Sequence, residues 1–251
     1  MLSIWDNQTI KPNEIILVQD GMLTDELYEV IEQWKLKLGD ILQLIVLTNN
    51  VGLGEALNIG LHACSYPLIA RMDTDDVAKE NRFEKQLHIF EHNNIDICSS
   101  WVSEFDKSIE NIVSYRKVPE LHQDIIIFSK KRNPINHPAV MYKKSSVLAS
   151  GGYKTMLLFE DYYLWIRMIL QGAKFYNIQE ALLSMRAGYG QLERRSGLEY
   201  ALHEFKFQKE LLALGYINHT QFFHNIIIRF TTRIIPKPFV RIIYQIMRKK
   251  S

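Results

Sequence analysis

Short apolar runs alternate with segments of helical periodicity over the first third of the chain. The runs at residues 15–18, 42–47 and 68–72 have the length and composition of buried parallel strands. Apolar residues at helical spacing occupy residues 24–38, and a second helical segment covers residues 55–63. Strands that alternate with helices indicate an α/β domain with a mainly parallel sheet.

The pattern is less regular in the rest of the chain. A helix is predicted at residues 79–92, and another begins at Glu160. A last helix is expected at residues 198–214, and we find no long repeat, low-complexity tract or linker. Short strands are predicted at residues 95–98, 112–115, 139–142, 175–178 and 182–185.

Three aspartates stand at the carboxyl end of the third predicted strand. Asp73, Asp75 and Asp76 fall so close together that their charges repel one another unless a counter-ion is bound. Carboxylate oxygens are the ligands that Mg²⁺ and Mn²⁺ prefer. Asp20 ends the first predicted strand, and ligands of parallel sheets bind beyond the carboxyl ends of the strands. We therefore expect these four aspartates to line one crevice that holds a divalent cation.

Residues 73–76 also match other patterns in part. A calcium loop of the EF-hand type is disfavoured because Ala78 stands where that loop needs glycine. A phosphatase of the haloacid dehalogenase kind has a similar DxDx(T/V) pattern at a strand end, with Asp73 as its nucleophile, but the paired-acid motif G-D-x-x-x-D is missing downstream. A solvated acidic turn would not explain the buried strand before it. The metal site is favoured, and the phosphatase is the alternative.

The composition is that of an ordinary folded protein. The chain has 251 residues, of which 47% are hydrophobic and 23% charged, a balance that excludes disordered and collagen-like classes. Cys64 and Cys98 cannot form a disulfide framework and the N-terminus does not read as an export signal, so we expect the reducing cytoplasm. No apolar run in the sequence has the roughly 18 residues that a membrane span requires.

Basic residues concentrate at the end of the chain. Residues 222–251 contain seven Lys or Arg and no Asp or Glu, whereas residues 1–221 are acidic overall. Apolar residues between Phe239 and Met247 fall on one helical face, a pattern typical of segments that bind anionic membranes. Packing on the protein's own body is the alternative, and the acidic body disfavours nucleic acid as a partner. We predict one domain at 1–221 and a basic amphipathic, membrane-associating helical tail at 222–251.

Five motifs resemble those of one known family, in order and at the family's spacing. They are PNEIILVQDG at residues 12–21, NNVGLGEALNIG at 49–60, RMDTDD at 71–76, NHP at 136–138 and EDYYLW at 160–165. Together they resemble the family 2 nucleotide-sugar glycosyltransferases of the GT-A fold, above all members from bacterial O-antigen and exopolysaccharide clusters. The resemblance spans nearly the whole chain and implies a GT-A fold with helices around a Rossmann-like sheet.

The resemblance also implies roles for the residues that match its motifs. Asp161 matches the family's catalytic base, with Glu160 positioning it, and Asp20 matches the acceptor of a hydrogen bond from uracil. The three aspartates at residues 73–76 match the ligands of the Mn²⁺ or Mg²⁺ that neutralises the diphosphate leaving group. Asp161 could instead have a purely structural role, because the helix dipole favours an acidic residue in the first turn of any helix.

Further polar residues are expected to bind the donor. Asn50 lies in the second motif, and Arg71 precedes the aspartates, although Arg71 is also suited to pair with one of them. His137 either contacts the donor or supports a proline-containing turn. A basic segment that contains glycine follows the last predicted strand. Guanidinium groups match phosphate oxygens, so this segment is suited to fold over the diphosphate; the alternative is an ordinary solvated stretch. Its basic residues are Arg186, Arg194 and Arg195.

The implied reaction is the transfer of galactose or glucose from a UDP-sugar to a lipid-linked acceptor such as GlcNAc-diphosphoundecaprenol. A single displacement inverts the anomeric configuration, so an α-linked donor gives a β-linkage, and likeness favours β1,3-galactosyl transfer. Such an enzyme would work in O-antigen or capsule synthesis as a peripheral protein on the cytoplasmic face of the bacterial inner membrane. A non-catalytic sugar-nucleotide binder is a third interpretation.

One part of the family's pattern is missing. Family members begin with a strand and a turn that contact the nucleotide, whereas residues 1–9 read as the end of the helix after that strand. Because the first strand is central in such sheets, its loss would leave neighbouring strands with unpaired backbone groups. We therefore expect the natural protein to start some tens of residues upstream, or this form to be truncated and impaired.

Overall fold

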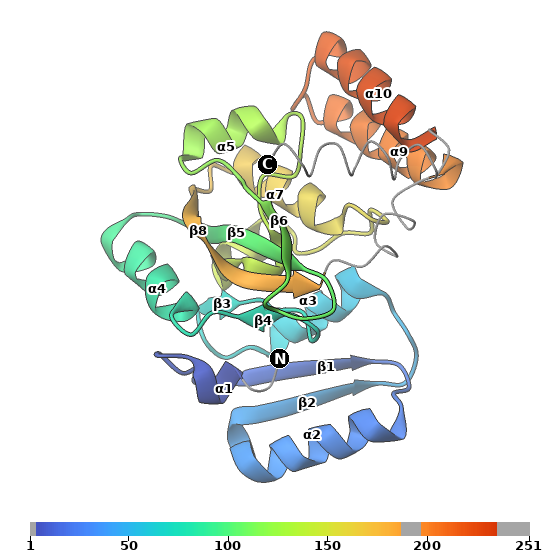
Figure 1. Cartoon of the computed structure of the whole chain (residues 1–251). Coiled ribbons are helices and arrows are strands. Elements are labelled where there is room, and N and C mark those ends of the chain that lie inside the picture. Colours follow the sequence, from blue (N-terminus) through green and yellow to red (C-terminus); the bar gives the residue numbers. More distant parts are fainter. Residues whose placement is uncertain (1–3, 187–196, 235–251) are drawn as a thin grey trace.

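Strands and helices alternate at the start of the chain, as the apolar pattern predicts. The computed structural model describes residues 4–186 and 197–234, and the structural statements below refer to these residues. The elements up to residue 63 agree with the predicted ones to within two residues. They are α1 (Ile4–Asn7), β1 (Ile15–Asp20), α2 (Asp25–Leu38), a 3-10 helix (Gly39–Ile41), β2 (Leu42–Leu47) and α3 (Leu53–Ala63) (Figure 1).

Further elements follow, and four of them were not predicted. β4 (Val77–Ala78), α6 (Lys144–Ala149) and the 3-10 helix His137–Ala139 are too short to show a period, and α5 (His122–Ser129) contains an unbroken apolar run that fits no single face. The elements are β3 (Leu68–Ala70), β4 (Val77–Ala78), α4 (Arg82–His92), β5 (Ile97–Phe105), β6 (Ile112–Arg116), α5 (His122–Ser129), a 3-10 helix (His137–Ala139), β7 (Met141–Lys143), α6 (Lys144–Ala149), α7 (Glu160–Leu170), β8 (Phe175–Arg186), α9 (Leu198–Ala213) and α10 (His219–Ile234).

The strands of the described residues form two sheets. β1 and β2 pair in parallel, with Asp20 opposite Leu47. The larger sheet has the order β3-β7-β5-β8-β4, with β6 paired to β5. In it β5 and β8 are parallel, whereas the other pairs are antiparallel, so the sheet is mixed. β1 and β3 belong to different sheets.

The two strands predicted at residues 175–178 and 182–185 are one strand, β8. The register with β5 shifts between Ser100 and Val102, so the strand accommodates extra residues without ending. Gln179 and Glu180 read as a break because they are polar, but they lie on the exposed side of the bulge. The prediction of two strands was therefore wrong.

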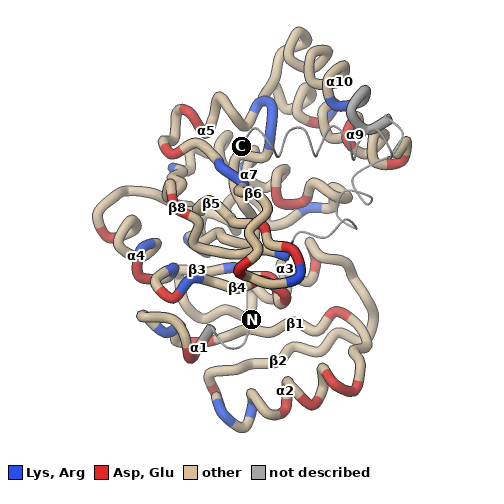
Figure 2. The backbone as a smooth tube through the Cα atoms, in the orientation of Figure 1, with Lys and Arg blue, Asp and Glu red and all other residues tan. Residues whose placement is uncertain are grey.

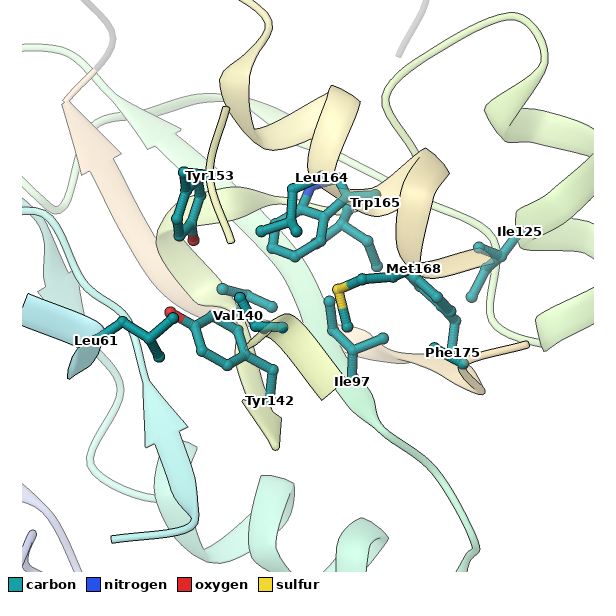
Figure 3. Packing of buried hydrophobic residues seen from close by; sticks show 13 residues of the cluster. Leu61, Ile97, Ile125, Val140, Tyr142, Tyr153, Leu164, Trp165, Met168 and Phe175 are labelled. Atoms are coloured by element: carbon teal, nitrogen blue, oxygen red, sulfur yellow. The ribbon is translucent and has the colours of Figure 1, made fainter. Parts of the chain in front are cut away.

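Helix α7 is the centre of the core. Its residues from Tyr162 to Met168 are all buried, including Arg167, whose guanidinium donates to the carbonyls of Ser150 and Gly152. Figure 3 shows one face of α7, with Trp165, packed over Ile97 of β5 and near Phe175 of β8. The sheet therefore supports α7 along its length.

The opposite face of α7 packs on the helix pair α9–α10. Tyr162 and Phe207 have ring centroids 4.7 Å apart, and Phe222 of α10 belongs to the same buried cluster. This packing holds the acidic first turn of α7 between the sheet and the helix pair (Figure 1). Within the described ranges, no helix is long and apolar enough to cross a membrane.

Candidate active site

The chain leaves β3 and turns at the three aspartates. The N–H of Arg71 donates to the carbonyl of Val140 at 2.9 Å, and the carbonyl of Asp73 accepts the N–H of Asp76 at 3.4 Å. Asp75 is exposed and Asp73 partly exposed, whereas Asp76 is only 2% exposed. Two carboxylates therefore face solvent, and the third lies beneath them.

Asp76 has an electrostatic environment that suits a cation. Both of its carboxylate oxygens are buried and accept no hydrogen bond from the described residues. Burial, followed by the charges of Asp73 and Asp75, raises the pKa of Asp76 to about 7. A divalent cation would neutralise this group of charges. The aspartates therefore fit the predicted metal, with Asp73 and Asp75 accessible and Asp76 on the inner side.

Arg71 pairs with one of these aspartates. Its Nη1 donates to Oδ2 of Asp73 at 2.8 Å, and its Nη2 donates to Oδ1. The side chain of Arg71 is buried, so this fork fixes the plane of the Asp73 carboxylate from the protein side. Arg71 thus pairs with an aspartate, which was one of the two roles expected for it. Its direct contact with the donor stays a prediction.

Arg82, which the sequence analysis missed, holds the aspartate turn from behind. It is fully buried in the first turn of α4, and its Nη2 donates to the carbonyls of Arg71 at 2.8 Å and Val140 at 3.2 Å. Its Nε donates to Oε1 of Gln86 at 3.0 Å, and Gln86 donates in turn to two core carbonyls. On sequence alone, an arginine and a glutamine four residues apart resemble a solvated helix pair.

Asp20 holds the turn before α3. Its Oδ1 accepts the N–H of Val51 at 2.7 Å, and its Oδ2 accepts the N–H of Gly52 at 3.1 Å. Asn50 donates from Nδ2 to the carbonyl of Asp20 at 3.3 Å and is exposed. A carboxylate has about four lone-pair sites, so Asp20 keeps capacity to accept a further hydrogen bond.

The first turns of α3 and α7 are in contact. A Cβ added at Gly54 would lie 3.4 Å from Cγ of Glu160, so glycine permits this close approach. Asn58 of α3 donates to the carbonyl of Tyr153 at 2.8 Å and accepts its N–H at 2.8 Å. Since Asp20 fixes the turn before α3, the end of β1 is joined to the start of α7 through that helix.

Asp161, the predicted base, has an orienting partner. Nδ2 of Asn133 donates to Oδ2 of Asp161 at 2.7 Å, and the N–H of Ile135 donates to Oδ1 of Asn133 at 3.3 Å, which fixes the orientation of the amide. Burial raises the pKa of the adjacent Glu160, and the charge of Asp161 adds to this effect. Asn133 was missed because it lies 28 residues before its partner.

His137 lies between the aspartate turn and α7. It is 9% exposed, its Nε2 is 2.9 Å from the hydroxyl oxygen of Tyr153, and its ring meets Trp165 edge-on. Burial and then the charge of Arg71 hold the pKa of His137 well below its usual range, so the ring is neutral. Burial, followed by the neighbouring Tyr142, raises the pKa of Tyr153 well above its usual range, and the charge of Asp161 adds to this effect. His137 thus supports the site, and its contact with donor stays a prediction.

The predicted phosphate-binding segment is described only at its start. Arg186, the last residue of β8, is exposed, and its guanidinium lies 5.3 Å from the ring centroid of Phe105. Arg194 and Arg195 lie outside the described residues. The role of these three arginines stays a prediction.

The assembled site has two kinds of chemistry within one network of contacts. The carboxylates at the ends of β1 and β3 can bind a cation and can accept a hydrogen bond from a polar ring. The carboxylate at the start of α7 can accept a proton. The buried pair His137 and Tyr153 joins the two parts. This arrangement fits the transfer of a group from a charged donor to a hydroxyl.

Comparisons with known sequences agree with this chemistry. Residues 3–147 match the family model described as glycosyl transferase family 2. The chain is 39% identical over 244 residues to an Escherichia coli protein named UDP-Gal:alpha-D-GlcNAc-diphosphoundecaprenol beta-1,3-galactosyltransferase, covering 97% of this chain and 87% of that protein. It is 35% identical to the amylovoran biosynthesis glycosyltransferase AmsE of Erwinia amylovora, covering 96% of this chain and 90% of that protein.

Solved structures show the same fold at low sequence identity. The mannosyltransferase PcManGT of Pyrobaculum calidifontis, in complex with GDP-Man and Mn²⁺, has a TM-score of 0.60 and 15% identity, with 83% of this chain and 59% of that chain covered. TarS 1-349 of S. aureus, in complex with UDP-GlcNAc, has a TM-score of 0.62 and 16% identity, with 84% and 62% covered. The chain spans about three fifths of these two structures. Together, the sequence and fold comparisons show that the chain belongs to glycosyl transferase family 2 and has the GT-A fold.

Proposed function

We propose that the protein is an inverting, metal-dependent hexosyltransferase. In this proposal it moves galactose, or alternatively glucose, from a UDP-sugar to a lipid-linked acceptor such as GlcNAc-diphosphoundecaprenol, forming a β1,3 linkage in O-antigen or capsule synthesis. The observation that carries the proposal is the 39% identity, over 97% of this chain, to a protein named for that reaction. The relative AmsE of Erwinia amylovora is named for amylovoran biosynthesis.

Asp161 is the proposed catalytic base. Its carboxylate would accept the proton of the acceptor hydroxyl as that oxygen attacks the anomeric carbon. Asn133 orients the carboxylate with a neutral N–H donor and therefore does not neutralise it. Glu160, which is half-buried against α3, positions the first turn of α7. A single displacement of this kind inverts the configuration of the transferred sugar.

The ends of β1 and β3 are the proposed donor site. Asp20 would accept a hydrogen bond from uracil, with Asn50 beside it at the exposed turn. Asp73, Asp75 and Asp76 would hold Mn²⁺ or Mg²⁺, which supplies charge neutralisation for the diphosphate leaving group. Arg71 keeps the Asp73 carboxylate in one plane for this purpose.

The remaining basic residues are proposed to bind phosphate. Arg186 stands exposed at the end of β8, and its guanidinium can donate two parallel hydrogen bonds to phosphate oxygens. Arg194 and Arg195 follow it in the sequence. Their contribution would be to offset the charge that develops on the departing diphosphate.

We further propose peripheral attachment to the cytoplasmic face of a bacterial inner membrane. Residues 222–251 carry seven Lys or Arg and no acidic residue, which favours an anionic membrane surface. An acceptor with a polyprenyl chain would be held in the same membrane. Nucleic acid is not proposed as a partner, because the remainder of the chain is acidic.

The phosphatase interpretation has no comparable support. Its nucleophile would be Asp73, and both oxygens of that carboxylate accept hydrogen bonds from Arg71. A carboxylate held in a guanidinium fork is a weakened nucleophile, because its negative charge is already shared. The relatives are named as glycosyltransferases.

A transfer assay tests the proposal. Purified protein is incubated with Mn²⁺, a panel of UDP-sugars and a synthetic GlcNAc-diphosphate lipid, and the lipid product is separated by chromatography. We expect transfer from UDP-galactose or UDP-glucose and its loss after chelation with EDTA. Release of inorganic phosphate from phosphosugars without any transfer would overturn the proposal in favour of the phosphatase.

A further inference from the structure

Helix α9 exposes a row of large apolar side chains. Leu198 is 62% exposed, Leu202 56% and Phe205 41%. The three residues follow one another at spacings of four and three, so they lie on one side of the helix. The opposite side of α9 is buried in the core through Phe207 and Leu211. The exposed side of α9 therefore offers an apolar surface to a second partner besides the core.

Helix α10 exposes apolar side chains as well. Phe223 is 60% exposed and Ile227, one turn later, is 64% exposed. Ile228 is 49% exposed. Phe222, by contrast, is buried, and its ring lies 5.9 Å from that of Phe205 on α9. Phe205, in the exposed row of α9, therefore contacts α10 next to the exposed Phe223, whose ring lies 5.5 Å from that of Phe222.

The two helices are joined by polar contacts that fix their relative position. Glu204 of α9 forms an ion pair with Arg229 of α10 at the buried side of the pair. Asn225 donates from Nδ2 to Oε1 of Gln208 at 2.9 Å. Figure 1 shows the pair side by side at one end of the molecule, away from β1, β2 and α2. The exposed rows are thus presented by a fixed unit.

The charge around this unit favours an anionic partner. Lys206 and Lys209 are exposed on α9, with Glu199 as the exposed acidic residue of that helix. α10 has no acidic residue. The segment 222–251, which begins within α10, carries seven Lys or Arg. Figure 2 shows acidic residues on α2, at the other end of the molecule. An apolar surface bordered by cations matches the interface of an anionic bilayer.

The helix pair is also coupled to the proposed base. The hydroxyl of Tyr163 on α7 donates to Oε1 of Glu210 on α9 at 2.8 Å, and the rings of Phe159 and Phe207 stack 4.8 Å apart. Asp161 lies in the first turn of α7, between Phe159, which caps the helix, and Tyr163. A surface that binds α9–α10 is therefore held at a fixed relation to the site where the acceptor would react.

We propose that the exposed faces of α9 and α10 together dock on an anionic lipid bilayer, so that the membrane-binding surface begins at Leu198 rather than at residue 222. The inference rests on the proposed function to the extent that a bilayer carries the lipid-linked acceptor. It adds α9 to the predicted tail and names the side chains that enter the interface. Apolar side chains of this size each favour the interface by burying hydrocarbon surface.

Vesicle co-sedimentation tests the proposal with a matched control. The full chain and the variant Leu198→Glu/Leu202→Glu are mixed with vesicles of phosphatidylcholine and phosphatidylglycerol. We expect the α9 variant to bind at least about tenfold more weakly than the unaltered chain, since two apolar contacts become charged. The control Val30→Glu/Leu36→Glu alters residues on α2 that are 43% and 89% exposed and is expected to bind like the unaltered chain.

Two outcomes overturn this inference. Either the unaltered chain fails to bind the vesicles, or the α9 variant binds as tightly as the α2 control. Activity is measured in parallel with a short-chain, water-soluble GlcNAc-diphosphate acceptor, for which the α9 variant is expected to keep the unaltered rate while losing activity on vesicle-bound acceptor. If the unaltered chain does not transfer sugar to the soluble acceptor, only the proposed function is contradicted. The membrane inference is tested separately, because vesicle binding is measured without substrate.

Discussion

Asn133 and Asp161 are joined by a hydrogen bond of 2.7 Å from Nδ2 of the amide to Oδ2 of the carboxylate. The amide is itself fixed, because its Oδ1 accepts the N–H of Ile135. A neutral donor orients a carboxylate without removing its charge. This relationship gives the proposed base a defined orientation at the start of α7.

Replacing Asn133 by alanine is expected to lower kcat by roughly ten- to a hundredfold, since a hydrogen bond to a charged group contributes about 1.5–3 kcal/mol. Steady-state rates measure the effect. Asn94→Ala, at an exposed asparagine, is the control. An unchanged rate for Asn133→Ala would remove Asn133 from the mechanism.

The buried Asp76 makes stability depend on pH in the absence of metal. Its pKa is raised from 3.8 to about 7, so the folded state binds this proton more tightly than the unfolded chain does. Stability is therefore highest below the unfolded pKa and falls as pH rises to about 7, where the folded carboxyl ionises.

Asp76→Asn removes this ionisation. The variant is expected to be more stable than the unaltered chain above about pH 7, by at most about 4 kcal/mol, and to lose this advantage below the unfolded pKa of 3.8. Urea unfolding in EDTA at several pH values measures the difference. Mn²⁺ is expected to stabilise the unaltered chain more than the variant, because a ligand that binds the native state raises its stability. A variant less stable at every pH would contradict the stated effect of Asp76.

Gly152 tests the contact between α3 and the chain before α7. Its φ is +62°, and an added Cβ would lie 2.7 Å from Oδ1 of Asn58, the atom that accepts the N–H of Tyr153. Gly215 has a φ of +68° with no atom within 4 Å of an added Cβ, so Gly215→Ala measures the conformational cost alone, about 1–2 kcal/mol. Thermal unfolding is expected to show a larger loss for Gly152→Ala. Equal losses would mean that the Asn58 contact contributes nothing.

Arg82 is expected to be essential for the stability of the aspartate turn. Arg82→Met leaves the buried carbonyl of Arg71 without its side-chain donor, which costs about 1–3 kcal/mol, whereas the carbonyl of Val140 keeps the N–H of Arg71. Lys85→Met, one turn later on α4, breaks an exposed pair with Glu180 and is expected to cost less than about 1 kcal/mol. Denaturant midpoints compare the two variants. A cost for Arg82→Met as small as that for Lys85→Met would show that the turn does not depend on Arg82.

The sequence predicted best the features that depend on neighbouring residues. β2 was predicted residue by residue, because its mostly apolar run begins soon after Gly39 and Asp40 and ends before Thr48. The aspartates at residues 73–76 stood out because three like charges in one turn require a compensating charge. These signals lie within a few positions of one another, so spacing alone reveals them.

Features that depend on distant partners could not be predicted. Arg82 is predicted to lie on a helix surface, whereas the folded chain buries it. Asn133 lies in the segment after α5 and gains its role from a carboxylate on α7. The strand β8 looked interrupted at Gln179 and Glu180 because periodicity does not show a bulge that its neighbour β5 supports. The antiparallel pairs of the larger sheet likewise depend on which strands meet, and the sequence does not state that.

The most direct test of the central claim is single-turnover transfer of galactose from UDP-galactose to a synthetic GlcNAc-diphosphate lipid by the unaltered chain and by Asp161→Asn, a variant that keeps the shape of the side chain. We predict a β-linked product, identified by NMR, and a rate about a hundredfold to ten-thousandfold lower for Asp161→Asn, with donor affinity unchanged, since a general base contributes that much. Transfer by Asp161→Asn at the unaltered rate, or an α-linked product, would contradict the account.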